Sequence, residues 1–160
     1  MENSAIWYNY DLSNEKQYIR CVKHLQKMIR NSMSYDQWQR RSKIGINKCP
    51  ICEIEKEYVK MESHHYPKTL FDVVDEHLQY LIETNQLDSK TDFEVCQEIM
   101  DMHFTNQVDY VVLCEYCHKK YHDEVPEILQ VIDEKWREQK EFREKFFKEN
   151  NIKLRSKNEN

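Results

Sequence analysis

The sequence predicts an α+β fold in which several helices surround a small two-stranded ribbon and helix that carry metal ions. Three observations favour this class. Four of the six cysteines form two CxxC pairs, apolar residues recur at helical spacing over most of the chain, and the β-branched run VDYVVL at residues 108–113 is typical of a strand. A chain of 160 residues suffices for one domain, or for one small domain with helical extensions.

Three regions are expected along the chain. Residues 1–45 form an N-terminal helical region, residues 46–125 form the metal-carrying core with a helical insertion at about 68–106, and residues 126–160 form a C-terminal helix and a polar tail.

Helix start signals define the first region. Apolar residues at helical spacing predict a helix over residues 14–31, with Ser13 as its N-cap. A second helix is expected from Tyr35, because Ser34 and Gln37 fit a capping box, and Gly45 ends it.

Later start signals divide the rest of the chain. The pairs Thr69 with Asp72 and Thr91 with Glu94 fit capping boxes, which predicts helices over residues 70–83 and 92–103. Helices are also expected at 115–122 and from Pro126 to about residue 150, since proline suits a first helical turn. A short strand is expected to lead into the histidine pair at 64–65.

Composition excludes several classes of protein. The single glycine rules out a GxGxxG or Walker loop, so neither a Rossmann dinucleotide site nor a P-loop is present. No apolar run approaches the roughly 18 residues that a membrane helix requires, and the N-terminus lacks the pattern of a signal peptide. We therefore expect no membrane partner and an intracellular, cytoplasmic protein.

Charge is distributed unevenly around the formal net charge of −5. Residues 1–45 contain eight Lys and Arg against four Asp and Glu, whereas residues 46–125 contain seven against seventeen. A nucleic-acid surface should be basic, so DNA contact is expected at the N-terminal helices. The contact residues suggested by charge alone are Arg40, Arg41 and Lys43. The acidic helices within residues 70–103 are a candidate surface for a protein partner.

The two CxxC pairs indicate a shared zinc ion. They are CPIC at 49–52 and CEYC at 114–117, so the four ligands would be Cys49, Cys52, Cys114 and Cys117. Thioredoxin-type redox chemistry would need one pair at the start of a helix in a βαβ unit, and neither pair has that setting. Cys21 and Cys96 stand alone in helical patterns and are expected to be small buried hydrophobes.

Histidines beside these pairs indicate a second metal ion. His118 and His122 are four residues apart and share one helical face, and His64 ends the strand between the two pairs. These three could hold one divalent ion with water in its open positions. His65 points to the other side of the strand, where a neutral imidazole could deprotonate an attacking water. Such a site could cleave a phosphodiester bond.

This arrangement resembles the HNH nucleases, the zinc-knuckle branch of the ββα-metal (His-Me finger) fold. The resemblance covers residues 46–123 and rests on CPIC at 49–52, HHYP at 64–67, LCEYCH at 113–118 and His122. The WQRR segment before the first pair and the stretch after the histidines are similar to phage-encoded HNH proteins, and a phage source would place the chain in the host cytoplasm. The resemblance implies that His64, His118 and His122 hold a catalytic Mg²⁺, Mn²⁺, Ni²⁺ or Zn²⁺ ion and that His65 is the general base.

The chain departs from the HNH pattern at two points. Asp109 stands where the family usually has asparagine, and Asn106 is a possible substitute for it. Sixty-one residues separate Cys52 from Cys114, so two predicted helices are inserted where many members have a short link.

Three hypotheses follow for the function. The first is a metal-dependent HNH endonuclease that hydrolyses DNA. The second is a non-catalytic, zinc-stabilised HNH-fold module that docks a protein partner or nucleic acid. The third is a structural zinc protein whose metals are saturated by protein ligands.

Overall fold

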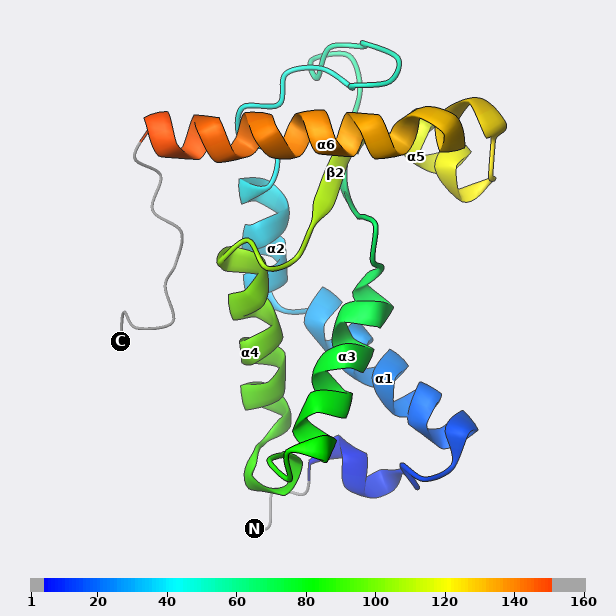
Figure 1. The fold of residues 1–160 in the computed structure, drawn as a ribbon, viewed down its shortest axis with the longest axis vertical. Coiled ribbons are helices and arrows are strands. Elements are labelled where there is room, and N and C mark those ends of the chain that lie inside the picture. Colours follow the sequence, from blue (N-terminus) through cyan, green and yellow to red (C-terminus); the bar gives the residue numbers. More distant parts are fainter. Residues whose placement is uncertain (1–4, 151–160) are drawn as a thin grey trace. The chain divides into compact units, whose positions relative to one another are not determined.

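The computed structural model describes residues 5–150, which separate into two compact units (Figure 1). Unit 1 comprises residues 5–36 and 68–107, and unit 2 comprises residues 37–67 and 108–150. Each unit is therefore built from two stretches of chain that are distant in sequence.

Unit 1 is a helical bundle in which helix α1 (Glu15–Arg30) packs against both α3 (Leu70–Glu83) and α4 (Asp92–Phe104). Short 3₁₀ turns at Ile6–Asn9 and Leu87–Ser89 complete it. The core comes from one face of each helix, as helical periodicity requires. Its fully buried side chains include Val22, Leu25, Ile29, Val74, Leu78, Leu81, Val95 and Ile99.

Capping explains where these helices begin. The capping boxes of Thr69 with Asp72 and of Thr91 with Glu94 are both present, so these two predictions are confirmed. The predicted cap of α1 is off by one residue, because Asn14 rather than Ser13 accepts the backbone N–H of Gln17. Helix α2 (Met33–Arg41) begins earlier than expected, and the hydroxyl of Ser32 accepts the backbone N–H of Tyr35.

Unit 2 contains the sheet, formed by strands β1 (Met61–His65) and β2 (Tyr110–Cys114). The strands pair antiparallel, with Ser63 opposite Val112 and His64 opposite Val111. Helix α5 (Glu115–His122) follows β2 without a loop, and α6 (Pro126–Glu149) packs against the same strand (Figure 1).

Helix α6 completes the free edge of β2 with side chains. Gln139 accepts the Val112 N–H at 2.8 Å and donates to the Val112 carbonyl at 2.9 Å, as a third strand would. Arg143 donates to the Tyr110 carbonyl at 3.0 Å and lies over the Tyr110 ring. Both side chains are buried. An unpaired strand edge is a site for unwanted pairing, and here it is covered from within the chain.

The α+β prediction is confirmed at this level: the described part of the chain is mostly helical, with one small antiparallel sheet. None of the described helices combines the length and hydropathy that a membrane span requires.

Candidate metal centres

The first cluster joins the two CxxC pairs. Cys49 and Cys52 lie in the loop before β1, whereas Cys114 ends β2 and Cys117 lies in the first turn of α5. A backbone bond from Cys49 N–H to the Ile54 carbonyl folds the first loop, and the Cys117 N–H donates to Cys114 Sγ at 3.4 Å. All four sulfur atoms lie within 4.8 Å of one another.

These four thiols fit a zinc ion. Four sulfurs about 2.3 Å from a central zinc stand about 3.8 Å apart in a tetrahedron, and Cys52 Sγ lies 3.6 Å from Cys114 Sγ. Burial raises the pKa of the Cys114 and Cys117 thiols, so a bound cation would be needed to keep them as thiolates at neutral pH. The donor set, four thiolates from two CxxC turns, is typical of a closed structural zinc site.

The second cluster consists of His64 on β1 with His118 and His122 on α5. His64 Nδ1 lies 3.0 Å and His122 Nε2 lies 2.9 Å from His118 Nε2. Imidazole nitrogens bound to one zinc ion stand about 3.3 Å apart, so a small outward shift would admit a transition-metal ion. Burial, followed by the proximity of His118, lowers the pKa of His122 and favours its neutral, metal-binding form.

Glu62 orients this cluster and was missed by the sequence analysis. Its carboxylate accepts a hydrogen bond from His118 Nδ1 at 2.6 Å and pairs with Lys60 at 3.0 Å. That bond holds the pKa of Glu62 below its usual range. With Nδ1 as the donor, His118 Nε2 presents its lone pair to His64 and His122. The available signal was strand alternation, since Glu62 and His64 are two residues apart and share a face.

The remaining predicted catalytic residues do not join the histidine cluster. His65 lies on the opposite face of β1, is 7% exposed, and stacks on Trp38 at a centroid distance of 5.0 Å. Asp109 forms an ion pair with Lys140 at 3.2 Å. Asn106 is exposed in the turn after α4, in a left-handed conformation with φ of 59°.

The charged residues with predicted partners also interact within the protein. Arg40 and Arg41 end α2 and Lys43 follows it, and each already interacts within the protein. Many carboxylates of the acidic segment have internal roles: Asp72 and Glu94 cap helices, and Glu98 pairs with Lys90 and His77. DNA contact at the first group and protein contact at the second remain predictions.

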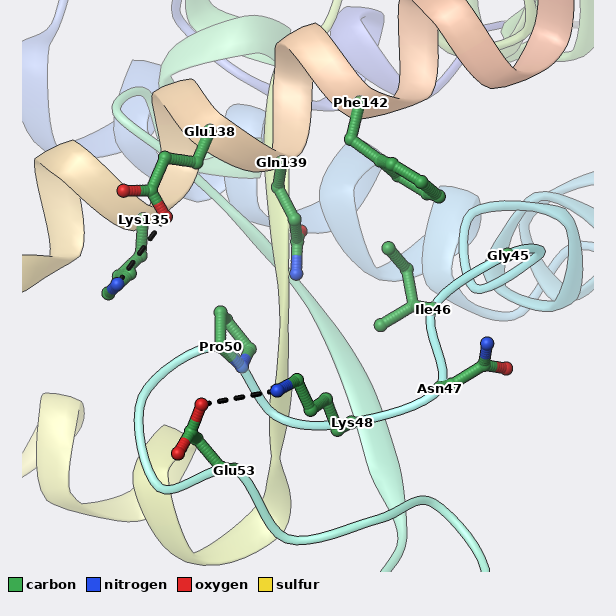
Figure 2. A pocket seen from close by; sticks show the side chains of 10 residues that line it. All are labelled: Gly45, Ile46, Asn47, Lys48, Pro50, Glu53, Lys135, Glu138, Gln139 and Phe142. Carbon is green, nitrogen blue, oxygen red and sulfur yellow. Dashed lines mark hydrogen bonds and ion pairs between the residues drawn. The ribbon is translucent and has the colours of Figure 1, made fainter. Parts of the chain in front are cut away.

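A shallow groove of about 460 Å³ lies elsewhere in unit 2, between the loop at residues 45–53 and α6 (Figure 2). Figure 2 shows Ile46, Pro50 and Phe142 along it and the ion pair of Lys48 with Glu53 beside it. None of the cysteine or histidine donors lines this groove, although Lys48, Pro50 and Glu53 of its lining belong to the loop that carries Cys49 and Cys52.

Comparison with known families bears on the first two hypotheses. The family model described as "Bacteriophage G278-like virion protein" matches residues 1–159. The chain belongs to this family. Neither the search of curated proteins nor the search of solved structures found a match.

Membership of the G278-like virion protein family corrects the HNH assignment. The match extends over essentially the whole chain, including both helical regions outside residues 46–123, and no HNH family was found. The predicted endonuclease function and the assignment as an enzyme, a nuclease or a hydrolase are therefore wrong. The second hypothesis, a non-catalytic HNH-fold binding module, is wrong for the same reason. The two strands and α5 do occur, but nothing identifies them as an HNH core. The phage association is supported.

Proposed function

We propose that this chain is a structural component of the phage particle and that zinc stabilises its unit 2. The observation that carries the proposal is the family match over residues 1–159 together with four cysteine sulfurs gathered within 4.8 Å. The family match supports a place in the phage particle, and the four cysteines support stabilisation by a bound zinc ion.

The zinc ion would act as the cross-link of unit 2. Cys49 and Cys52 lie in an irregular loop outside the named helices and strands. An isolated β-bridge between Lys48 and Glu55 closes this loop. Cys114 and Cys117 belong to the junction of β2 and α5. Binding of all four thiolates ties the loop to the sheet, and the free energy of zinc binding becomes folding free energy.

The histidine cluster would hold a second ion, in a site that stabilises rather than cleaves. His64 lies on β1, and His118 and His122 lie on α5, so one ion would join strand to helix. Glu62 would fix the tautomer of His118. Three neutral imidazoles suit Zn²⁺ or Ni²⁺ better than Mg²⁺, which prefers oxygen ligands.

The place of action would then be the particle rather than the free host cytoplasm. Incorporation into a particle requires contact with other protein components, so a protein partner is part of this proposal. The cysteine centre supports it because a metal cross-link maintains one defined shape at a small cost in chain length.

Incorporation of cysteine variants tests the proposal. Particles from cells that express wild-type, Cys114→Ser or Cys96→Ser protein are purified on a density gradient, and the chain is quantified by mass spectrometry. Cys96 is a cysteine outside the cluster and serves as the matched control. We expect wild-type and Cys96→Ser chains in the particle and loss of Cys114→Ser. Absence of the wild-type chain would overturn the virion role, and normal incorporation of Cys114→Ser would overturn the role of zinc.

A further inference from the structure

Helix α1 carries a row of positive charge that the proposed function does not use. Five of its sixteen residues are Lys or Arg, and Glu15 is its single acidic residue. We call these five the α1 stripe: Lys16, Arg20, Lys23, Lys27 and Arg30.

The α1 stripe is straight and faces away from the core of unit 1. The spacing of four, three, four and three residues places all five side chains within an arc of about 80°, at 100° per residue. Buried Cys21, Leu25 and Ile29 occupy the opposite side of the helix. From Lys16 to Arg30 the row extends about 21 Å, at a rise of 1.5 Å per residue.

No carboxylate neutralises this row within the described part of the chain. All five side chains are exposed, and none takes part in an ion pair or side-chain hydrogen bond there. Nearby acids are used elsewhere: Asp75 accepts the hydroxyl of Tyr18, and Asp92 accepts the backbone N–H of Ile6. Five like charges on one helix face repel one another and lower the stability of the helix. An external anion bound along the row would relieve this repulsion.

We propose that the α1 stripe binds the phosphate backbone of duplex nucleic acid. A duplex carries one negative charge per about 1.7 Å of axis, so 21 Å of it presents about twelve phosphates to five cations. Between Lys16 and Arg30 the one Trp, Tyr or Phe residue is Tyr18, whose hydroxyl is donated to α3. Beside the row, His24 is likewise engaged, by an edge-on contact and a hydrogen bond with Tyr10. Because these aromatic groups are occupied within the protein, the surface fits paired strands better than single strands.

An acidic protein surface is the competing occupant. One acidic surface that could bind here is formed by α3 and α4 of a second copy of the chain. Many carboxylates of these helices already cap helix ends or form ion pairs within their own chain. A regular, dense polyanion therefore complements the α1 stripe better. Because its cations address phosphates only, binding should be independent of base sequence.

Fluorescence anisotropy with a labelled 24-base-pair duplex and the zinc-loaded full chain tests the proposal. With up to five phosphate contacts, the plot of log K against log salt should have a slope of about −4 to −5. The triple variant Arg20→Gln, Lys23→Gln, Lys27→Gln should lower the slope by about 3 and weaken binding on the order of 100-fold at 0.1 M salt. These side chains are exposed, and circular dichroism checks that the fold is retained.

The control triple Lys120→Gln, Lys145→Gln, Lys148→Gln removes the same charge from exposed positions on α5 and α6. It should bind duplex within about threefold of wild type. An equal loss in both triples, no duplex binding at 50 mM salt, or tighter binding of a single strand would overturn the proposal. Equal or tighter binding of polyglutamate, lost in the α1 triple, would assign the stripe to an acidic protein instead.

Discussion

Replacement of Gln139 by leucine should weaken unit 2 through the edge of β2. The Gln139 amide pairs with both the N–H and the carbonyl of Val112, at 2.8 and 2.9 Å, and its side chain is buried. Leucine has similar bulk but leaves both backbone groups without a partner. Each buried unsatisfied group costs about 1–3 kcal/mol, and burial of the leucine methyls offsets about 1 kcal/mol. The expected net loss of stability is about 3 kcal/mol.

Hydrogen exchange of the Val112 amide, followed by NMR on zinc-loaded protein, measures this loss locally. A change of about 3 kcal/mol corresponds to an exchange rate about 100-fold faster. Gln130→Leu is the matched control, since Gln130 is an exposed residue of the same helix. It should leave exchange at Val112 within about twofold of wild type. If Gln139→Leu accelerates exchange less than fivefold, side-chain pairing by α6 does not satisfy the edge of β2.

Three further predictions concern the metal centres and the core of unit 1. Cys114→Ser should lower the zinc content by about one ion per chain in elemental analysis, whereas Cys96→Ser should leave it unchanged. Equal zinc content in both variants would refute zinc binding by the four cysteines. Glu62→Gln should weaken Ni²⁺ or Zn²⁺ binding at the histidines about 10- to 100-fold in calorimetry while the zinc of the cysteines is retained; unchanged affinity would show that Glu62 does not position His118. Burial lowers the pKa of His103 to about 4 from an ordinary value of 6.5, so the unfolded state binds the proton first. This contribution to the free energy of unfolding is complete above pH 6.5 and falls by about 3 kcal/mol between pH 6.5 and pH 4. Urea denaturation at several pH values should show this fall in the wild type and not in His103→Leu.

Local signals predicted much of the fold. The capping boxes at Thr69 and Thr91 and the proline at 126 correctly placed three helix starts, because caps and first-turn prolines act through neighbouring residues only. The start of α2 was wrong, since Ser32 and Ser34 are both chemically able to cap and only packing selects between them. The burial of His103, which is 2% exposed and lies edge-on to Tyr35, likewise depends on packing and had no local signal.

The sequence could predict which residues form the candidate metal centres, but not whether a bound ion would be catalytic or structural. The CxxC spacing and the four-residue spacing of His118 and His122 pointed to side chains that the structure does gather, because such geometry depends on local turns. The same donors serve catalytic and structural ions, so spacing alone could not separate the two. The packing of Gln139 against β2 had no local signal, since it joins residues 27 positions apart.

The content of this chain in purified particles tests the central claim most directly. Particles are washed in high salt to remove loosely bound protein, and the chain is quantified against a known structural component by mass spectrometry. A fixed copy number per particle that survives the wash is expected of a structural virion protein. Recovery of the chain only in the lysate, or its complete removal by the wash, would contradict the virion role.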